Sequence, residues 1–174
     1  MRIPHELPPL KGLPSGHRYF ADCLRETWTR WMLQAMSQNN TSTWFVTLTF
    51  KKNTPRRKAY GAARAWLRNL EMSYFHKTDE GGSKLRWVMV EGMQLREVIH
   101  YHLLIMGEGL NAVSKKRWEC RWSSLTDFTA SSRIHPARAT AAPYLAGHIS
   151  GSGNAQVGGR WRDLNAPKSL ACCA

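Results

Sequence analysis

Two hydrophobic rhythms divide the chain into segments that predict helices and segments that predict strands. Apolar residues recur at helical spacing over 21–38 and again over 54–75, so each stretch predicts an amphipathic helix. The second begins at Thr54-Pro55, a capping residue followed by proline at the first helical position. Weaker patterns predict short helices over 111–122 and 141–150.

Other segments alternate in polarity or are rich in β-branched and aromatic residues, and these predict strands. They cover residues 44–50, 85–91, 98–106 and 131–135. In the first, tryptophan, valine, leucine and phenylalanine share one face, while Thr47 and Thr49 share the other. Residues 1–18 hold four of the eight prolines and predict an irregular arm, whereas 151–159 predicts a flexible or tightly turned segment.

The segment 98–106 carries two histidines inside an apolar strand pattern. Because successive side chains on a strand point to opposite faces, His100 and His102 share a face with Leu104. The opposite face is wholly apolar apart from a tyrosine and predicts the core side. The strand therefore predicts two adjacent imidazoles in a polar or metal-bearing groove.

A carboxylate on the preceding strand is a candidate to join these imidazoles. Val88 and Val90 alternate with Glu91. We expect both valines to share the core with Tyr101 and Leu103, which places Glu91 on the histidine face.

Two imidazoles and a carboxylate are ligands that suit Mg²⁺ or Mn²⁺. The predicted metal set is His100, His102 and Glu91. Glu97 is a rival third ligand, although its parity places it opposite the histidines. A packed or surface-exposed histidine pair is the alternative, and the spacing leaves both interpretations open.

Composition points to a polyanionic partner. The 174 residues suffice for one domain, and 25 basic against 12 acidic residues give a net charge of +13. Nucleic acid is the leading partner. The sequence lacks an apolar run that would span a bilayer, and its four cysteines show neither zinc spacing nor a disulfide framework. We therefore expect no membrane association and a cytoplasmic location.

Tyr144 and His148 are candidate catalytic residues. A tyrosine acts as a covalent nucleophile when a neighbouring group takes its proton. His148 follows four residues later, on the same face of the predicted helix, where it can relay a proton. Simple packing of Tyr144 and solvation of His148 are the alternatives. Charge runs such as Lys51-Lys52 fit either phosphate contact or a solvated face.

Three ordered motifs resemble those of HUH endonucleases, and most closely those of the rolling-circle replication initiators of plasmids and phages. They are Phe45-Val46-Thr47-Leu48-Thr49-Phe50, then Glu91 with His100-Tyr101-His102, then Tyr144-Leu145-Ala146. Ile134-His135-Pro136 and Gly159-Arg160-Trp161 also resemble that family's pattern, so the resemblance covers roughly residues 43–162.

The resemblance implies an α+β fold with a central antiparallel sheet and helices on one face, similar to ferredoxin or RRM domains. It implies that Tyr144 nicks and rejoins single-stranded DNA through a 5′-phosphotyrosyl link, with Mg²⁺ or Mn²⁺ on the open face. We expect an arm and helix over 1–42, a nuclease domain over 43–174, no appended helicase domain, and a host helicase as partner. The predicted DNA contacts are Thr47, Thr49, Lys51, Lys52, Arg160 and Trp161.

Two positions depart from the family's pattern. Gly147 stands where the family usually has lysine, so an arginine, Lys51 or Lys52 would have to supply that charge. His148 stands where some members carry a second tyrosine, which suggests an enzyme with one tyrosine nucleophile. A relaxase or transposase of the same superfamily, a nuclease that uses water, and a non-catalytic nucleic-acid-binding module remain alternatives.

Overall fold

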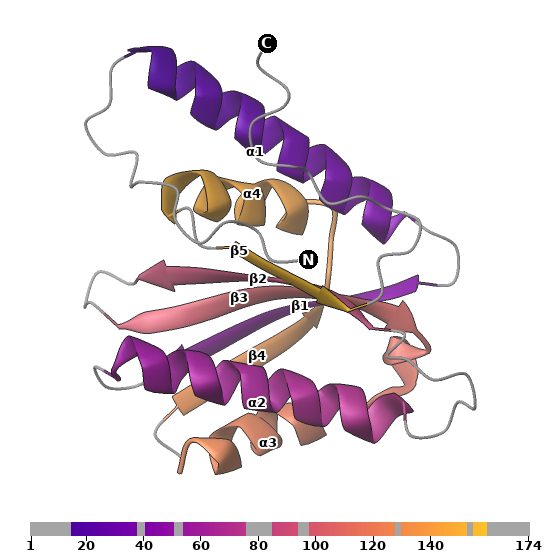
Figure 1. Cartoon of the computed structure of the whole chain (residues 1–174). Helices are drawn as coiled ribbons and strands as arrows, with labels where there is room; N and C mark the ends of the chain where they lie inside the picture. Colours follow the sequence, from indigo (N-terminus) through magenta and orange to yellow (C-terminus); the bar gives the residue numbers. More distant parts are fainter. Residues whose placement is uncertain are drawn as a thin grey trace.

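The computed structural model describes residues 15–37, 41–50, 54–75, 85–93, 98–127, 130–152 and 155–159 (Figure 1). The helices are α1 (Ser15–Met36), α2 (Arg56–Phe75), η1 (Leu110–Ala112, a 3₁₀ turn), α3 (Lys115–Leu125) and α4 (Ala141–Ser152). The strands are β1 (Thr41–Phe50), β2 (Arg86–Met93), β3 (Ile99–Glu108), β4 (Ala130–Pro136) and β5 (Ala155–Gly159).

The strands form one antiparallel sheet in the order β4-β1-β3-β2-β5. The run β1–α2–β2–β3–α3–β4 has the element order of a ferredoxin-like unit. Helix α1 precedes this unit, and α4 and β5 follow it. The α+β class and the antiparallel sheet are as predicted.

Helices cover both faces of the sheet, whereas the resemblance implied one. In Figure 1, α1 and α4 lie above the sheet and α2 and α3 lie below it. Two separate buried clusters match this layering. One joins α2, α3 and residues such as Tyr101 and Leu103, and the other joins α1, α4 and residues such as Val90 and Leu104. The second cluster exists because α1 and α4 each present an apolar stripe that needs a partner.

The predicted strands and longer helices are confirmed, with two differences. The expected helix over 111–122 is divided, because η1 ends before Ser114 caps α3 through a hydrogen bond from the Arg117 backbone N–H. The segment 151–159 is not simply a turn. Its last residues form β5, which pairs with β2, and Gly158 leaves room there for the Trp87 ring, since a Cβ would lie 2.1 Å from Trp87 Cζ2.

Among the described residues, no helix combines the length and hydropathy that a bilayer crossing requires.

Candidate active site

The two histidines occupy the central strand of the sheet. β3 lies between β1 and β2, and its register places His102 beside Thr47 and His100 beside Thr49. His100 is 7% exposed and His102 is 6% exposed, and their ring centroids lie 4.6 Å apart in an edge-on arrangement. They are thus neighbours on one face, as predicted.

Helix α4 delivers Tyr144 to these histidines. Leu145, Ala146 and Ile149 are buried between α4 and the rest of the fold, which orients the helix on the sheet. The Tyr144 side chain remains 48% exposed, and its hydroxyl oxygen lies 3.0 Å from His102 Nε2. A phenol that is both solvent-accessible and hydrogen-bonded to an imidazole is placed for chemistry rather than for packing.

His148 completes an aromatic cluster around His102. Its ring centroid lies 4.8 Å from that of Tyr144 and 5.0 Å from that of His102. The spacing of four residues puts His148 beside Tyr144 on the same helix face. The structure therefore assembles Tyr144, His148, His100 and His102, which are four of the predicted site residues, in one place.

Thr47 links the cluster to β1. Its Oγ1 lies 3.1 Å from His102 Nδ1, so both ring nitrogens of His102 have hydrogen-bond partners. A neutral imidazole has one donor and one acceptor nitrogen. If Nδ1–H donates to Thr47 Oγ1, then Nε2 accepts from the Tyr144 hydroxyl. The second tautomer reverses both bonds.

Burial keeps all three imidazoles neutral. Desolvation, followed by repulsion from His100 and His148, lowers the pKa of His102 from 6.5 to about 3. Desolvation also lowers the pKa of His100, with His148 adding to the shift and the Val98 backbone opposing it. The pKa of His148 is lowered by desolvation as well.

Tyr144 is shifted in the opposite direction. Desolvation raises its pKa above the ordinary tyrosine value of 10.0. The phenol is therefore protonated at neutral pH, and any nucleophilic step requires a base to take its proton.

The expectation that Glu91 shares the histidine face is wrong. The register of β2 on β3 pairs Glu91 with Tyr101 and Val90 with His102. Directly paired residues point to the same side, so Glu91 faces the α2 layer. There it accepts a hydrogen bond from the Tyr101 hydroxyl at 3.2 Å and forms an ion pair with Arg56 at 2.9 Å.

Gly92 takes the place beside His100 where the carboxylate was expected. A Cβ at position 92 would lie 2.5 Å from His100 Nε2, so only glycine accommodates the ring as it stands. The sequence argument failed because it assigned Val88 and Val90 to the wrong core cluster.

The described residues do not fit the predicted three-residue metal site. Glu91 lies on the other face, and no group of three His, Cys, Asp or Glu side chains in the described ranges is arranged to hold a metal ion. His102 already has a partner on each nitrogen, whereas the buried Nδ1 of His100 lacks a well-formed hydrogen bond.

The predicted DNA contacts divide into two groups. Thr47 and Thr49 lie on the histidine face, because their partners on β3 are His102 and His100. The other four lie outside the described residues; they are Lys51, Lys52, Arg160 and Trp161. Glu97 also lies outside them.

Two side chains that the sequence argument did not single out also lie on this face. Phe45 stacks on His102 with ring centroids 5.6 Å apart at 18°, and its edge-on contact with Tyr144 spans 5.8 Å. Arg133 on β4 is exposed and pairs with Thr47. The parity of the predicted strand 131–135 was the available signal for Arg133, but its use required knowledge of which strand pairs with β4.

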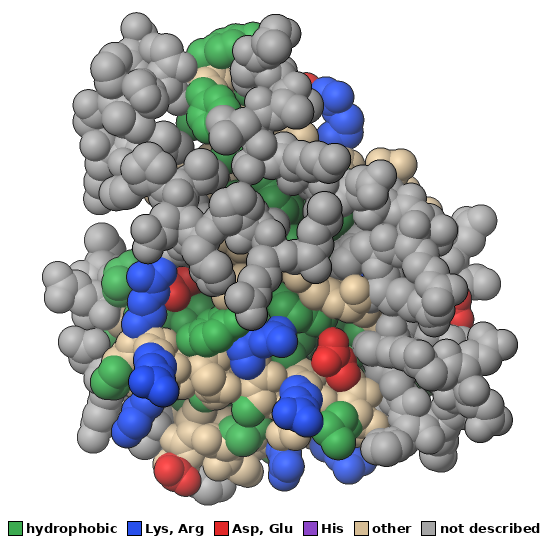
Figure 2. Space-filling view, viewed as in Figure 1, with side chains coloured by type: hydrophobic (Ala, Val, Ile, Leu, Met, Phe, Trp, Pro, Cys, Tyr) green, Lys and Arg blue, Asp and Glu red, His purple; other side chains and the backbone are tan. Residues whose placement is uncertain are grey.

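Basic residues also gather on the opposite layer. Figure 2 shows Lys and Arg side chains spread over the lower part of the molecule, where Figure 1 places α2 and α3. The sheet lies between these helices and the histidine face. The exposed cations on them are Arg56, Arg57, Lys58, Arg64, Arg68, Lys116, Arg117 and Arg121.

Comparison with known proteins places this site within a matched family region. The model of a family described as replication-associated protein ORF2 matches residues 43–151. That range runs from β1 to α4 and includes Thr47, both strand histidines, Tyr144 and His148. No curated protein and no solved structure gave a significant match to the chain.

Proposed function

Since the chain belongs to the replication-associated protein ORF2 family, we propose that it nicks and rejoins single-stranded DNA to initiate replication, with Tyr144 as nucleophile. One observation carries the proposal: an exposed tyrosine hydroxyl lies 3.0 Å from a neutral imidazole nitrogen on the open part of a sheet. This mechanism corresponds to that of HUH endonucleases of the rolling-circle initiator type.

The proposed step transfers a phosphoryl group from DNA to the protein. In the tautomer with Nδ1–H bonded to Thr47, Nε2 of His102 accepts the Tyr144 proton while the phenol oxygen attacks phosphorus. The bond between phosphorus and the 3′-oxygen breaks, and a 5′-phosphotyrosyl link forms. The proton passes from His102 through His148 to the leaving oxygen, which becomes a 3′-hydroxyl.

Substrate binding favours this proton transfer. His102 is a weak base in the free protein because burial and its neighbours lower its pKa to about 3. A DNA phosphate beside the ring adds negative charge, which stabilises the imidazolium and raises that pKa. The reverse reaction needs only a 3′-hydroxyl in the same position, so cleavage and joining share one site.

An unpaired strand suits the surface around Tyr144. Phe45 offers an aromatic face for base stacking, and Arg133 and Thr49 offer groups for phosphate contact. In-line attack also requires a phosphate that the helix-borne phenol can approach directly. The basic layer of α2 and α3 faces away and does not contact the same phosphate.

A covalent-adduct assay tests the proposal. Labelled single-stranded oligonucleotides that tile the parent replicon are incubated with the whole protein and separated on denaturing gels. We expect an adduct that Tyr144→Phe abolishes and that the control Tyr19→Phe, at a 70% exposed position on α1, retains. Cleavage without an adduct that persists in Tyr144→Phe would instead point to water as nucleophile.

A divalent cofactor, Mg²⁺ or Mn²⁺, remains a proposal. A bound ion would polarise the scissile phosphate, and His100 and His102 are the imidazoles on the correct face. The assay is therefore run with Mg²⁺, with Mn²⁺ and with EDTA. Adduct formation that EDTA abolishes would establish the requirement, whereas adduct formation in EDTA would exclude it.

A non-catalytic nucleic-acid-binding module is the second candidate. The low basicity of His102 and the net charge of +13 favour it. Tight binding of single strands with no adduct under any metal condition would identify this function.

A further inference from the structure

The groups that surround the Tyr144 hydroxyl are all uncharged. His102 and His148 are held neutral by burial, and Thr47 and Phe45 carry no charge. A phosphodiester is anionic, and negative charge on its oxygens is redistributed when a nucleophile attacks phosphorus. A preorganised cation beside the nucleophile lowers the energy of such a transition state.

Helix α1 brings a guanidinium group to the helix that carries Tyr144. Arg25 Nε would lie 4.0 Å from a Cβ built on Gly147. Gly147 follows Tyr144 by three residues and precedes His148, so it occupies the adjoining position on the same helix surface. Because glycine has no side chain, the arginine lies directly over the α4 backbone.

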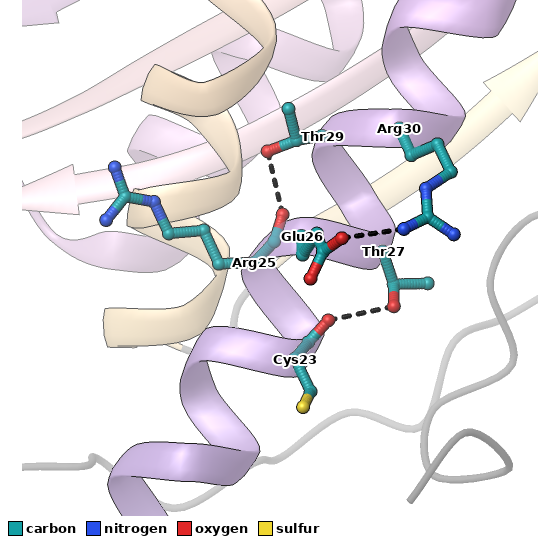
Figure 3. A network of polar contacts seen from close by, with 6 residues as sticks. All are labelled: Cys23, Arg25, Glu26, Thr27, Thr29 and Arg30. Carbon is teal, nitrogen blue, oxygen red and sulfur yellow. Dashed lines mark hydrogen bonds and ion pairs between the residues drawn. The ribbon is translucent and has the colours of Figure 1, made fainter.

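Arg25 is also free of acidic partners. No carboxylate among the residues that the structure describes forms an ion pair with it, and its side chain is exposed. Figure 3 shows Arg25 extending from α1 across α4, while Arg30 on the other side of α1 turns back to Glu26. The Arg30–Glu26 pair has an N–O separation of 2.6 Å, so Arg30 is already neutralised within α1.

We propose that Arg25 contacts the scissile phosphate and supplies the positive charge that the Tyr144 site otherwise lacks. This inference rests on the proposed strand-transfer function. It assigns α1, which precedes the matched range 43–151, a direct part in the reaction. The bare Gly147 position and the arginine above it act as one phosphate-contacting unit, built from two helices.

The test compares charge removal with charge relocation. We expect Arg25→Gln to slow adduct formation by roughly tenfold to a hundredfold. Arg30→Gln is the matched control, because it removes the same charge from the same helix and should leave the rate within about twofold of wild type.

Relocation of the cation distinguishes a phosphate contact from a structural role. A Cβ at position 147 meets Arg25 only at ordinary van der Waals distance, so a side chain fits there. We expect the double variant Arg25→Gln with Gly147→Lys to recover much of the lost rate. Arg25→Gln with Gly147→Ala gains the same helix propensity without charge and should recover none.

Binding measurements keep the inference separate from the proposed function. Anisotropy of a labelled, mixed-sequence single-stranded DNA is measured against salt concentration for each variant. Loss of one phosphate contact in Arg25→Gln should lower the logarithmic salt slope by about one, whether or not an adduct forms. An unchanged slope, or an adduct that depends on Tyr144 but not on Arg25, would overturn the inference and leave the strand-transfer proposal intact. If wild type forms no adduct, the strand-transfer proposal fails, and the slope alone decides whether Arg25 contacts phosphate.

Discussion

Acidification should unfold this protein because its site histidines are buried as neutral rings. The pKa of His102 is about 3 in the folded chain, against 6.5 for an unperturbed imidazole. Between these values the unfolded state binds a proton that the folded state does not bind. Stability therefore rises with pH across this window and is lost as pH falls from about 6.5 towards 3.

The magnitude follows from the two pKa values of His102. A full shift corresponds to about 1.4 kcal/mol for each pH unit within the window, so this one residue removes about 2 kcal/mol at pH 5 and about 3 kcal/mol at pH 4. Native domains are stable by roughly 5–15 kcal/mol, so this loss is large. His100 and His148 are shifted in the same direction and add to it.

Urea unfolding at a series of pH values measures this effect, with the fluorescence of the eight tryptophans as the signal. The variant His102→Gln removes the titrating ring, so its unfolding free energy should depend less steeply on pH below 6.5. His135→Gln, at an exposed position on β4, is the control and should retain the wild-type dependence. A pH dependence in His102→Gln as steep as that of wild type would refute the burial argument, whatever its stability at neutral pH.

Two other substitutions test the geometry of the site. Gly92→Ala forces a methyl group to within 2.5 Å of His100 Nε2, so we expect the ring to move and stability to fall by about 1–3 kcal/mol in urea unfolding. Gly61→Ala, where nothing lies within 4 Å, should instead stabilise α2 by about 0.5–1 kcal/mol, and equal effects at both positions would contradict this account. Glu91→Gln weakens the ion pair with the largely exposed Arg56, so it should cost at most about 1 kcal/mol and leave adduct formation unchanged. A lost adduct in that variant would show that Glu91 does act at the histidine site.

The local elements could be predicted because their signals are short-range. β1, β3 and α4 follow from periodicity and capping, which depend on neighbouring residues. β5 could not be found in this way, because Ala155–Gly159 has little strand propensity and is ordered by its pairing with β2. Partner strands supplied what the segment's own residues lack.

The error over Glu91 has a related cause. Parity along β2 correctly separated Val88 and Val90 from Glu91, but it contained no information about which face each set would occupy. A strand register is set by pairing and by the burial of whole faces. With apolar clusters on both sides of this sheet, valines fit either face, and only the observed pairing decides between them.

The amino-acid sequence by itself determined the strand that holds His100 and His102, the helix that carries Tyr144, and the excess of positive charge. Periodicity and composition are properties of the chain, so they can be read before it folds. Tertiary structure alone decided that Tyr144 meets His102 and that Glu91 does not. It also placed Arg25 over Gly147, because contacts between residues distant in sequence depend on register and on helix packing.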